Sequence, residues 1–304
     1  MAPISDNYRS RTNKDSAIIS RREPVVYSNV EAIANESTKS IVHGFERDGY
    51  ALIEDLFSEE EVSSWDAEIQ SLAATEEIKK RDESFLEPGS TNVRSIFRVH
   101  MLSDLVDRLV RDPRLLDLAR TILGSDVYVH QSRANLKPGF RGKEFYWHSD
   151  FETWHVEDGM PAMRAISCSV LLTDNDDTNG PLMLMPGSQK YFISCVGETP
   201  DNHYKESLKK QEYGVPDDDS LRFLAKQCGI KTIKARAGSV VFFDCNTMHG
   251  SNSNISPFDR RNLFFVYNSV ENSLEEPKYG LSPRPEYVAT RESFQALRAL
   301  KVAA

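Results

Sequence analysis

The chain has 304 residues, of which 39% are hydrophobic and 10% aromatic, and this composition allows a large buried core. Its formal net charge of −9 disfavours a broad nucleic-acid-binding surface, and no apolar run approaches the about 20 residues that a membrane span needs. The N-terminus lacks the apolar segment of a secretory signal, and the four cysteines (Cys168, Cys195, Cys228 and Cys245) have no CxxC spacing, so we expect a cytoplasmic protein with reduced thiols.

The first part of the chain predicts an arm followed by a helix. Residues 1–35 are polar with scattered arginines and lysines, so we expect a flexible or loosely docked N-terminal arm over 1–35 and a single domain over 36–304. The alternative is an ordered arm packed on the domain. Ser58-Glu-Glu-Glu61 fits a capping box, which marks the start of a helix. Apolar residues then recur at spacings of three and four: Val62, Trp65, Ile69 and Leu72.

Two further helices are predicted, over 102–110 and 113–122, because Pro113 suits a first helical turn and Gly124 suits the position after a helix end. The pattern then changes to alternation, which is typical of a strand. One face of that strand would carry Val127, Val129, Gln131, Arg133 and Asn135. Such a polar face belongs either to a half-exposed sheet or to the inside of a barrel that binds a polar ligand.

The second half of the chain predicts mostly strands. They are expected at residues 165–173, 182–185, 239–243 and 263–270, separated by turn-forming sequences. Residues 198–230 form a polar, partly helical insertion, and an insertion of this length is often a lid or a binding loop. Helices followed by many short strands indicate an α+β domain with a β-barrel or sandwich core.

One aromatic stretch suggests a metal site. Side chains at i and i+2 share a strand face, so His148 and Asp150 could bind one ion while Ser149 points away. His249 would join them from the end of a neighbouring strand. Two histidines and one carboxylate can bind one face of Fe(II) and leave the other face open. A zinc hydrolase is a weaker alternative, because no Glu is placed as in His-Glu-x-x-His.

An iron site that activates dioxygen commonly uses a chelating co-substrate with a second carboxylate. Arg260 follows His249-Gly250 and suits bidentate capture of that carboxylate, since the guanidinium is planar. Arg261 is the alternative, because a register slip of one residue exchanges the two arginines.

Several motifs together resemble a known family, the ectoine hydroxylases, within the phytanoyl-CoA-hydroxylase-like group of iron(II)/2-oxoglutarate dioxygenases. The most specific motif is Phe145-Tyr-Trp-His-Ser-Asp-Phe-Glu-Thr-Trp-His155. The others are Asp48-Gly-Tyr50, Glu157-Asp-Gly-Met-Pro161, Met163-Arg-Ala165, Asn179 to Ser188, and His249-Gly-Ser251 with Arg260. The resemblance covers about residues 41–270, and it departs from the group pattern at Gln189, where many members have His.

The resemblance implies a double-stranded β-helix (jelly-roll) core with flanking helices packed on one side. It also implies hydroxylation of ectoine to 5-hydroxyectoine with Fe(II), 2-oxoglutarate and dioxygen, releasing succinate and carbon dioxide. Iron would be held by His148, Asp150 and His249. 2-Oxoglutarate would be bound by Lys137, Arg260, Asn135 and Ser251. For Lys137, the alternative is a solvated loop lysine before Pro138-Gly139.

Ectoine is a small cyclic amidine with a carboxylate, and an amidinium ring suits an aromatic cage. The candidate cage residues are Trp154, Phe145 and Phe264, with Phe97 a weaker fourth, and Gln131 would hydrogen-bond the substrate. Core packing is the alternative for these aromatic residues.

Two other functions stay open at this point. A dioxygenase of the same fold could hydroxylate another small polar acid such as an amino acid, or a metal-free barrel could bind a small solute without chemistry. We expect no nucleic-acid or membrane partner, and the sequence leaves the oligomeric state open, with a homodimer as one option.

Overall fold

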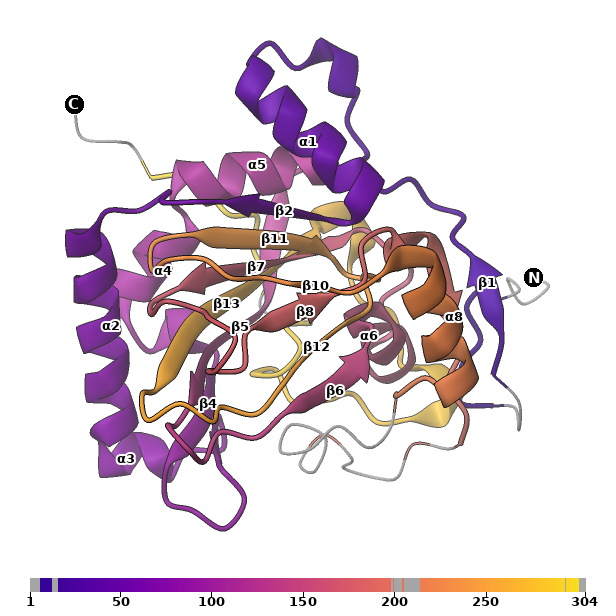
Figure 1. Cartoon of the computed structure of the whole chain (residues 1–304). Coiled ribbons are helices and arrows are strands. Elements are labelled where there is room, and N and C mark those ends of the chain that lie inside the picture. Colours follow the sequence, from indigo (N-terminus) through magenta and orange to yellow (C-terminus); the bar gives the residue numbers. More distant parts are fainter. Residues whose placement is uncertain are drawn as a thin grey trace.

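The computed structural model describes residues 6–12, 16–197, 199, 204, 214–292 and 294–300. Its core is two antiparallel sheets that face each other, with helices packed against the outside of the larger one (Figure 1). This arrangement confirms the predicted α+β class and the jelly-roll core.

The larger sheet has the strand order β2-β11-β7-β13-β5-β4-β3. In chain order its strands are β2 (Tyr50–Ile53), β3 (Ser84–Leu86), β4 (Val93–Phe97), β5 (Val127–Lys137), β7 (Ala165–Leu171), β11 (Val240–Asp244) and β13 (Arg260–Ser269). The smaller sheet has the order β10-β8-β12-β6. Its strands are β6 (Phe145–His148), β8 (Leu182–Leu184), β10 (Lys231–Thr232) and β12 (His249–Ser251). A separate pair joins β1 (Ile18–Ser20) to β9 (Tyr191–Ile193).

The helices begin and end at residues with clear local signals. They are α1 (Glu36–Asp48), α2 (Glu59–Ala74), α3 (Glu76–Lys79), α4 (Asp104–Val110), α5 (Pro113–Leu123), α6 (Asp150–Asp158) and α8 (Asp218–Cys228). Short 3-10 helices lie at Val30–Ala32, Val99–Met101, Ser188–Lys190, Val270–Asn272 and Lys278–Gly280. The predicted capping box is present, since Ser58 and Glu61 bond each other's backbone N–H groups. Gly124 ends α5 in the left-handed conformation, as predicted.

Two apolar clusters hold these layers together. The larger one joins the outer face of the seven-stranded sheet to helices α1, α2, α4 and α5. Removing this apolar surface from water is the main stabilising term for such a layer. The smaller cluster lies between the two sheets and includes Leu184, Phe243 and Phe264. It closes the barrel on one side and leaves the polar residues of β5 and β13 to line the remaining interior.

A β-bulge interrupts β5 at His130. Strand β13 pairs with β5 along its length, but the register shifts between Val266, opposite Gln131, and Tyr267, opposite Val129. His130 is thereby an extra residue on β5, and an extra residue of this kind changes which way the following side chains point.

The bulge overturns one prediction. Val127 and Val129 belong to the apolar cluster on the helix side, together with Ala134. Arg133 and Asn135 instead line the interior of the barrel. The prediction that these alternate residues share a single face is therefore wrong, because the alternation is interrupted between Val129 and Gln131.

The described residues near the N-terminus pack on the domain. Tyr8 is 1% exposed and Arg11 is 4% exposed. Arg11 makes ion pairs of 2.7 Å with Glu152 and 2.6 Å with Glu157, both on α6. These contacts differ from the loosely docked arm that the polar composition suggested, because the partners of Arg11 lie far along the chain. The division at residue 35 stays a prediction.

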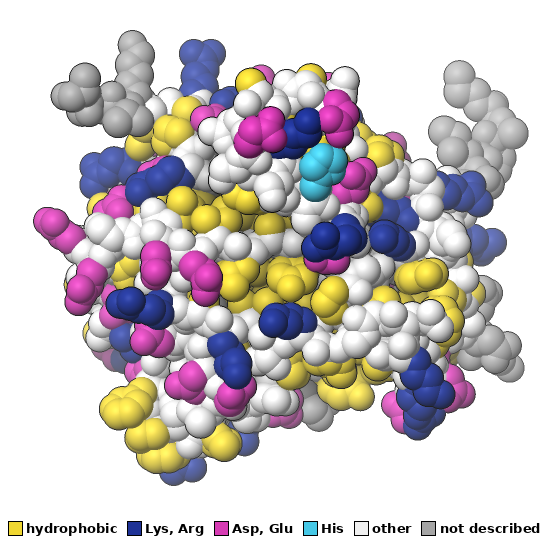
Figure 2. Space-filling model, turned by 45° about the horizontal axis from the view of Figure 1, so that its top comes forward, with side chains coloured by type: hydrophobic (Ala, Val, Ile, Leu, Met, Phe, Trp, Pro, Cys, Tyr) yellow, Lys and Arg dark blue, Asp and Glu magenta, His cyan; other side chains and the backbone are white. Residues whose placement is uncertain are grey.

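The predicted insertion at 198–230 falls partly outside the described residues. Its described end contains α8, whose N-cap Asp217 accepts hydrogen bonds from the N–H groups of Asp219 and Ser220. The expectation that this insertion forms a lid stays a prediction. No helix within the described residues is long and apolar enough to span a membrane. On the face shown in Figure 2, basic and acidic side chains are interspersed.

Candidate metal centre and co-substrate site

Three side chains converge where β6, α6 and β12 meet. His249 lies directly opposite His148 in the antiparallel pair of β12 with β6. The Nε2 atoms of His148 and His249 lie 3.7 Å and 3.8 Å from Oδ1 of Asp150. One ligand atom from each residue lies within 4.8 Å of the other two. Among the described residues, this is the group of ligand side chains compact enough to hold one ion.

The local structure around Asp150 differs from the prediction. His148 ends β6, Ser149 is the N-cap, and Asp150 is the first residue of α6. The prediction that His148 and Asp150 share a face of one strand is therefore wrong; a strand-to-helix turn brings them together. His249 is the first residue of β12, which pairs with β6, so it comes from the end of a neighbouring strand as predicted, after the turn that follows β11.

Hydrogen bonds fix the orientation of all three ligands. Nδ1 of His148 lies 2.6 Å from the carbonyl oxygen of Tyr146, and Nδ1 of His249 lies 3.0 Å from that of Thr247. A protonated Nδ1 donates to each carbonyl, which leaves the Nε2 lone pairs directed at the centre. Ser167 donates to Oδ2 of Asp150 over 3.1 Å and leaves Oδ1 available.

The electrostatics of the site favour the protonation states that bind a metal. Burial and the neighbouring His249 lower the pKa of His148 to about 4, so its imidazole is neutral near pH 7. Burial alone would raise the pKa of Asp150, but His249, His148 and Arg133 outweigh it and the pKa is lowered. Two imidazoles and one carboxylate are the donor set typical of non-haem Fe(II) oxygenases.

A cavity opens from the two histidines into the barrel. Its lining combines two ligands with cationic, polar and aromatic side chains: Arg133, Asn135, Phe145, His148, Leu182, His249, Gly250, Ser251, Arg260 and Phe264. Three of the four residues predicted to bind 2-oxoglutarate, Asn135, Ser251 and Arg260, are in this set.

Arg260 and Arg261 point in opposite directions from the start of β13. Arg260 is 2% exposed and donates a hydrogen bond of 2.8 Å to the carbonyl of Gly180. Burial, followed by the charges of Arg94 and Arg133, lowers its pKa to about 10. Arg261 instead lies on the other side of the sheet and pairs with Asp66 at 2.6 Å and 2.9 Å. The geometry therefore favours Arg260 as the cation of the cavity.

Lys137 is fully buried beside this cavity. Its Nζ donates to Ser251 Oγ over 2.8 Å and also to the carbonyl of Asn252. Burial, followed by the charges of Arg260 and Arg94, lowers its pKa to about 5. The alternative of a solvated loop lysine is wrong, since Lys137 is 0% exposed.

The residues predicted to bind the substrate differ in their position relative to the cavity. Phe145 and Phe264 line the cavity, and arginines approach their rings: Arg94 lies 3.9 Å from the Phe145 centroid and Arg133 lies 5.0 Å from that of Phe264. The weaker candidate Phe97 is 1% exposed and packs edge-to-face on Phe85.

Gln131 and Trp154 are not in the lining of this cavity, as far as the described residues define it. Trp154 packs edge-to-face on His130 with centroids 5.0 Å apart. Gln131 follows His130 in the chain and donates a hydrogen bond of 2.7 Å to the carbonyl of Val288. Trp154 of α6 thus contacts the bulge residue, and Gln131 follows it on β5.

Arg133 lines the cavity, although the sequence predicted only that it belongs to a polar strand face. Its Nε is buried and has no hydrogen-bond partner within the described part of the chain. Burial lowers its pKa, and Asp150 partly opposes that shift. Its position two residues from both Gln131 and Asn135 was a usable signal, because the three alternate on one strand.

Comparisons with known proteins agree with this site. Residues 45–262 match the family Phytanoyl-CoA dioxygenase (PhyH). The chain is 65% identical over 300 residues to a protein of Bordetella bronchiseptica named ectoine dioxygenase, covering 99% of this chain and 97% of that protein. It is 53% identical over 296 residues to the ectoine dioxygenase of Stutzerimonas stutzeri, covering 96% and 97% of the two chains.

Solved structures of ectoine-related proteins also match this chain over nearly its whole length. The crystal structure of EctD from S. alaskensis with 2-oxoglutarate and 5-hydroxyectoine superposes with a TM-score of 0.86 at 46% identity, covering 97% of this chain and 98% of that one. The form of that protein with bound Fe superposes with a TM-score of 0.85 at 45% identity and the same coverage.

Proposed function

This chain belongs to the phytanoyl-CoA dioxygenase family, and we propose on that premise that it is an iron(II)- and 2-oxoglutarate-dependent dioxygenase that converts ectoine to 5-hydroxyectoine. The relatives named ectoine dioxygenase match nearly its whole length. The related EctD structures hold Fe in one case, and 2-oxoglutarate with 5-hydroxyectoine in another.

One observation carries the proposal: the cavity that begins at His148 and His249 also contains a buried arginine, Arg260, that has no carboxylate partner among the described residues. A buried cation without a counter-ion is costly, so the site is built to receive an anion. The Nε of Arg260 and the Oδ1 of Asn135 are buried without hydrogen-bond partners in the described part of the chain. The residues present therefore fit both a metal and an acidic co-substrate.

The roles of the cavity residues follow from their placement. Arg260 would hold the far carboxylate of 2-oxoglutarate through charge-assisted hydrogen bonds. Lys137 and Ser251 form one hydrogen-bonded pair beside it. Iron held by His148, Asp150 and His249 would supply the oxidation of a substrate C–H bond by dioxygen, coupled to conversion of 2-oxoglutarate to succinate and carbon dioxide.

The protein part of the mechanism is orientation and exclusion of water. Phe145 and Phe264 would present aromatic faces toward the amidinium ring of ectoine. Trp154 and Gln131, beside the bulge residue His130, would contact the substrate farther from the metal. These substrate roles are proposals, and so are a homodimer and a cytoplasmic location.

The decisive experiment is incubation of the purified protein with Fe(II), 2-oxoglutarate, oxygen and ectoine, with the product identified by mass spectrometry and NMR. We expect 5-hydroxyectoine and an equal amount of succinate. Turnover of proline or another amino acid but not of ectoine would reassign the substrate. Ectoine binding that is independent of Fe(II), without succinate release, would exclude the enzyme.

A further inference from the structure

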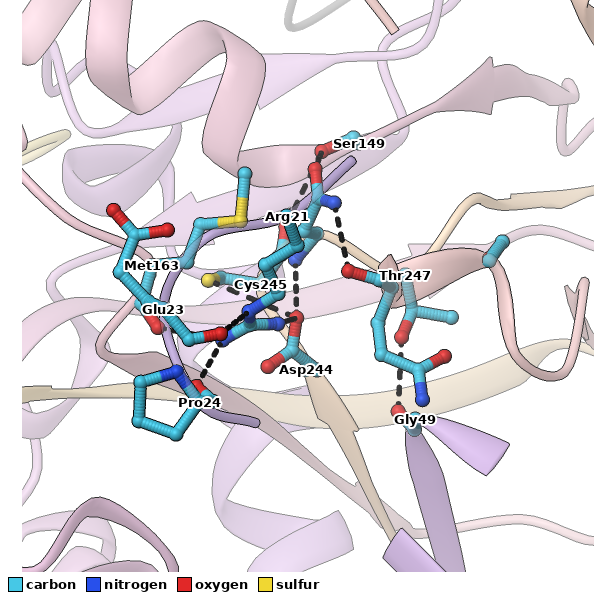
Figure 3. A network of polar contacts seen from close by, with 12 residues as sticks. Arg21, Glu23, Pro24, Gly49, Ser149, Met163, Asp244, Cys245 and Thr247 are labelled. Atoms are coloured by element: carbon cyan, nitrogen blue, oxygen red, sulfur yellow. Dashed lines mark hydrogen bonds and ion pairs between the residues drawn. The ribbon is translucent and has the colours of Figure 1, made fainter. Parts of the chain in front are cut away.

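A buried ion pair joins the N-terminal segment to the turn that precedes His249. Arg21 donates to Oδ1 of Asp244 over 2.8 Å, and both side chains are 3% exposed (Figure 3). Three other N–H groups of Arg21 reach backbone carbonyls, those of Glu23, Pro24 and Met163, at 3.1, 2.9 and 2.8 Å. A planar guanidinium held by four hydrogen bonds keeps its partner in one position.

Asp244 is the first residue of that turn and organises it. Its Oδ1 also accepts the backbone N–H of Asn246 over 2.8 Å, and its carbonyl accepts that of Thr247 over 2.9 Å. The carbonyl of Thr247 in turn accepts the hydrogen bond from Nδ1 of His249. Arg21 is thus linked to the orientation of the His249 imidazole through one carboxylate and one turn.

The same turn also contacts the residue between the other two ligands. Ser149 donates to Oδ1 of Asn246 over 3.0 Å (Figure 3 shows Ser149 beside this network). The N–H of Phe151 bonds the carbonyl of Cys245 over 2.8 Å. The turn therefore meets the chain just after His148 and just after Asp150, so its position affects all three ligands.

We infer that Arg21 is a positioning residue for the metal centre: through Asp244 and the turn Asp244–Thr247 it fixes the ligand geometry from outside the cavity. The inference rests on the proposed function, because it assumes that these three side chains bind a metal. A purely structural alternative is that Arg21 only anchors the N-terminal segment to the domain. A positioning role predicts that substitution of Arg21 weakens metal binding. A purely structural role predicts an effect on folding stability alone.

Binding of Co(II) distinguishes the two roles of Arg21, because the visible absorption of bound Co(II) reports the ligand geometry without any turnover. The variants are Arg21→Gln, Arg21→Lys and the matched control Arg22→Gln, whose side chain is exposed and bonds Asn7 instead. We expect Arg21→Gln to bind Co(II) about 10–100-fold more weakly with an altered absorption spectrum, as for other residues that orient ligands. Arg22→Gln should match the wild type, and Arg21→Lys should lie between them.

Unchanged Co(II) affinity and spectrum in Arg21→Gln would overturn the inference, even if urea unfolding showed the variant to be less stable. If Arg21→Gln does not fold, Ser149→Ala tests the other end of the network, with the same weakening expected and an unchanged spectrum counting against it. Wild-type protein that binds Co(II) no better than His148→Ala would instead contradict the proposed metal centre.

Discussion

Lys137 and Ser251 are joined by a hydrogen bond of 2.8 Å that links the buried end of β5 to β12. The bond joins an amine with a strongly lowered pKa to the short strand that also carries the metal ligand His249. If the pair contacts the co-substrate as proposed, binding should change the protonation of Lys137.

Lys137 should make the free protein less stable at neutral pH. Its pKa is about 5 in the folded protein and 10.5 as an ordinary lysine, so between these values the unfolded chain holds one proton more. Stability should then rise with pH over that window, by up to about 1.4 kcal/mol per pH unit from this residue. We expect Lys137→Met to be more stable by about 1–4 kcal/mol near pH 7 and to lose this slope. Urea unfolding at several pH values checks both statements; an equal slope in the two proteins would contradict them.

Binding of 2-oxoglutarate should take up a proton at Lys137. A carboxylate next to the amine favours its charged form, so the pKa should rise through neutrality on binding. Calorimetric titration in buffers of different ionisation heat measures the uptake. We expect close to one proton for the wild type, none from this residue in Lys137→Met, and about 10–100-fold weaker binding in the variant. Identical uptake in both proteins would assign the proton elsewhere.

Arg260 and Arg261 should differ sharply on substitution. Arg260→Gln removes the buried cation of the cavity, and we expect the Kd for 2-oxoglutarate to rise about 10–100-fold. Arg261→Gln breaks a half-buried pair with Asp66 outside the cavity and should leave that Kd unchanged. Direct titration of both variants with 2-oxoglutarate measures the two Kd values. A larger increase in Arg261→Gln would assign the co-substrate carboxylate to Arg261 instead.

Loss of one ligand should remove the metal. We expect His148→Ala and Asp150→Ala, prepared without oxygen and supplied with Fe(II), to retain little iron, because two ligands hold a divalent ion weakly. His43→Ala is the matched control, since that imidazole lies on α1 with about half of its side chain exposed. Iron content by elemental analysis is the measurement. Full occupancy in either ligand variant would be incompatible with the proposed centre.

Arg11 should matter for stability rather than for chemistry. Arg11→Ala leaves Glu152 and Glu157 buried without their common cation. Breaking such a pair from one side typically costs about 3–5 kcal/mol. Arg9→Ala, which changes an exposed arginine two residues away, should cost little. Urea unfolding compares them, and similar midpoints would mean that the N-terminal contacts contribute little.

Local sequence patterns predicted several helix boundaries of the fold. The capping box at Ser58, Pro113 at the start of α5 and Gly124 at its end each act within one turn of a helix, so sequence alone identifies them. The triad was predictable because its residue types and order are distinctive, whereas the role of Arg260 stays a prediction. The strand β13 begins three residues earlier than predicted, at Arg260, since the polar start of a buried strand gives no apolar signal.

Other features depend on contacts that sequence periodicity does not encode. Helix α6 lacks an apolar stripe because it is buried on nearly every side, with its glutamates paired to Arg11. The bulge at His130 arises from pairing with β13. The ion pair of Arg21 with Asp244 joins residues more than 200 positions apart. Each of these required the tertiary structure.

The bulge at His130 also bears on how the substrate range of this protein can change. Strand β5 faces the helix layer before the bulge with Val127 and Val129, and the cavity after it with Arg133 and Asn135. Point substitutions after the bulge would reshape the cavity while the helix layer stays packed. A one-residue deletion between the bulge and Arg133 would instead turn Arg133 and Asn135 toward the apolar helices. Variation among relatives with other substrates should therefore be found as replacements along β5, whereas its length should be nearly invariant.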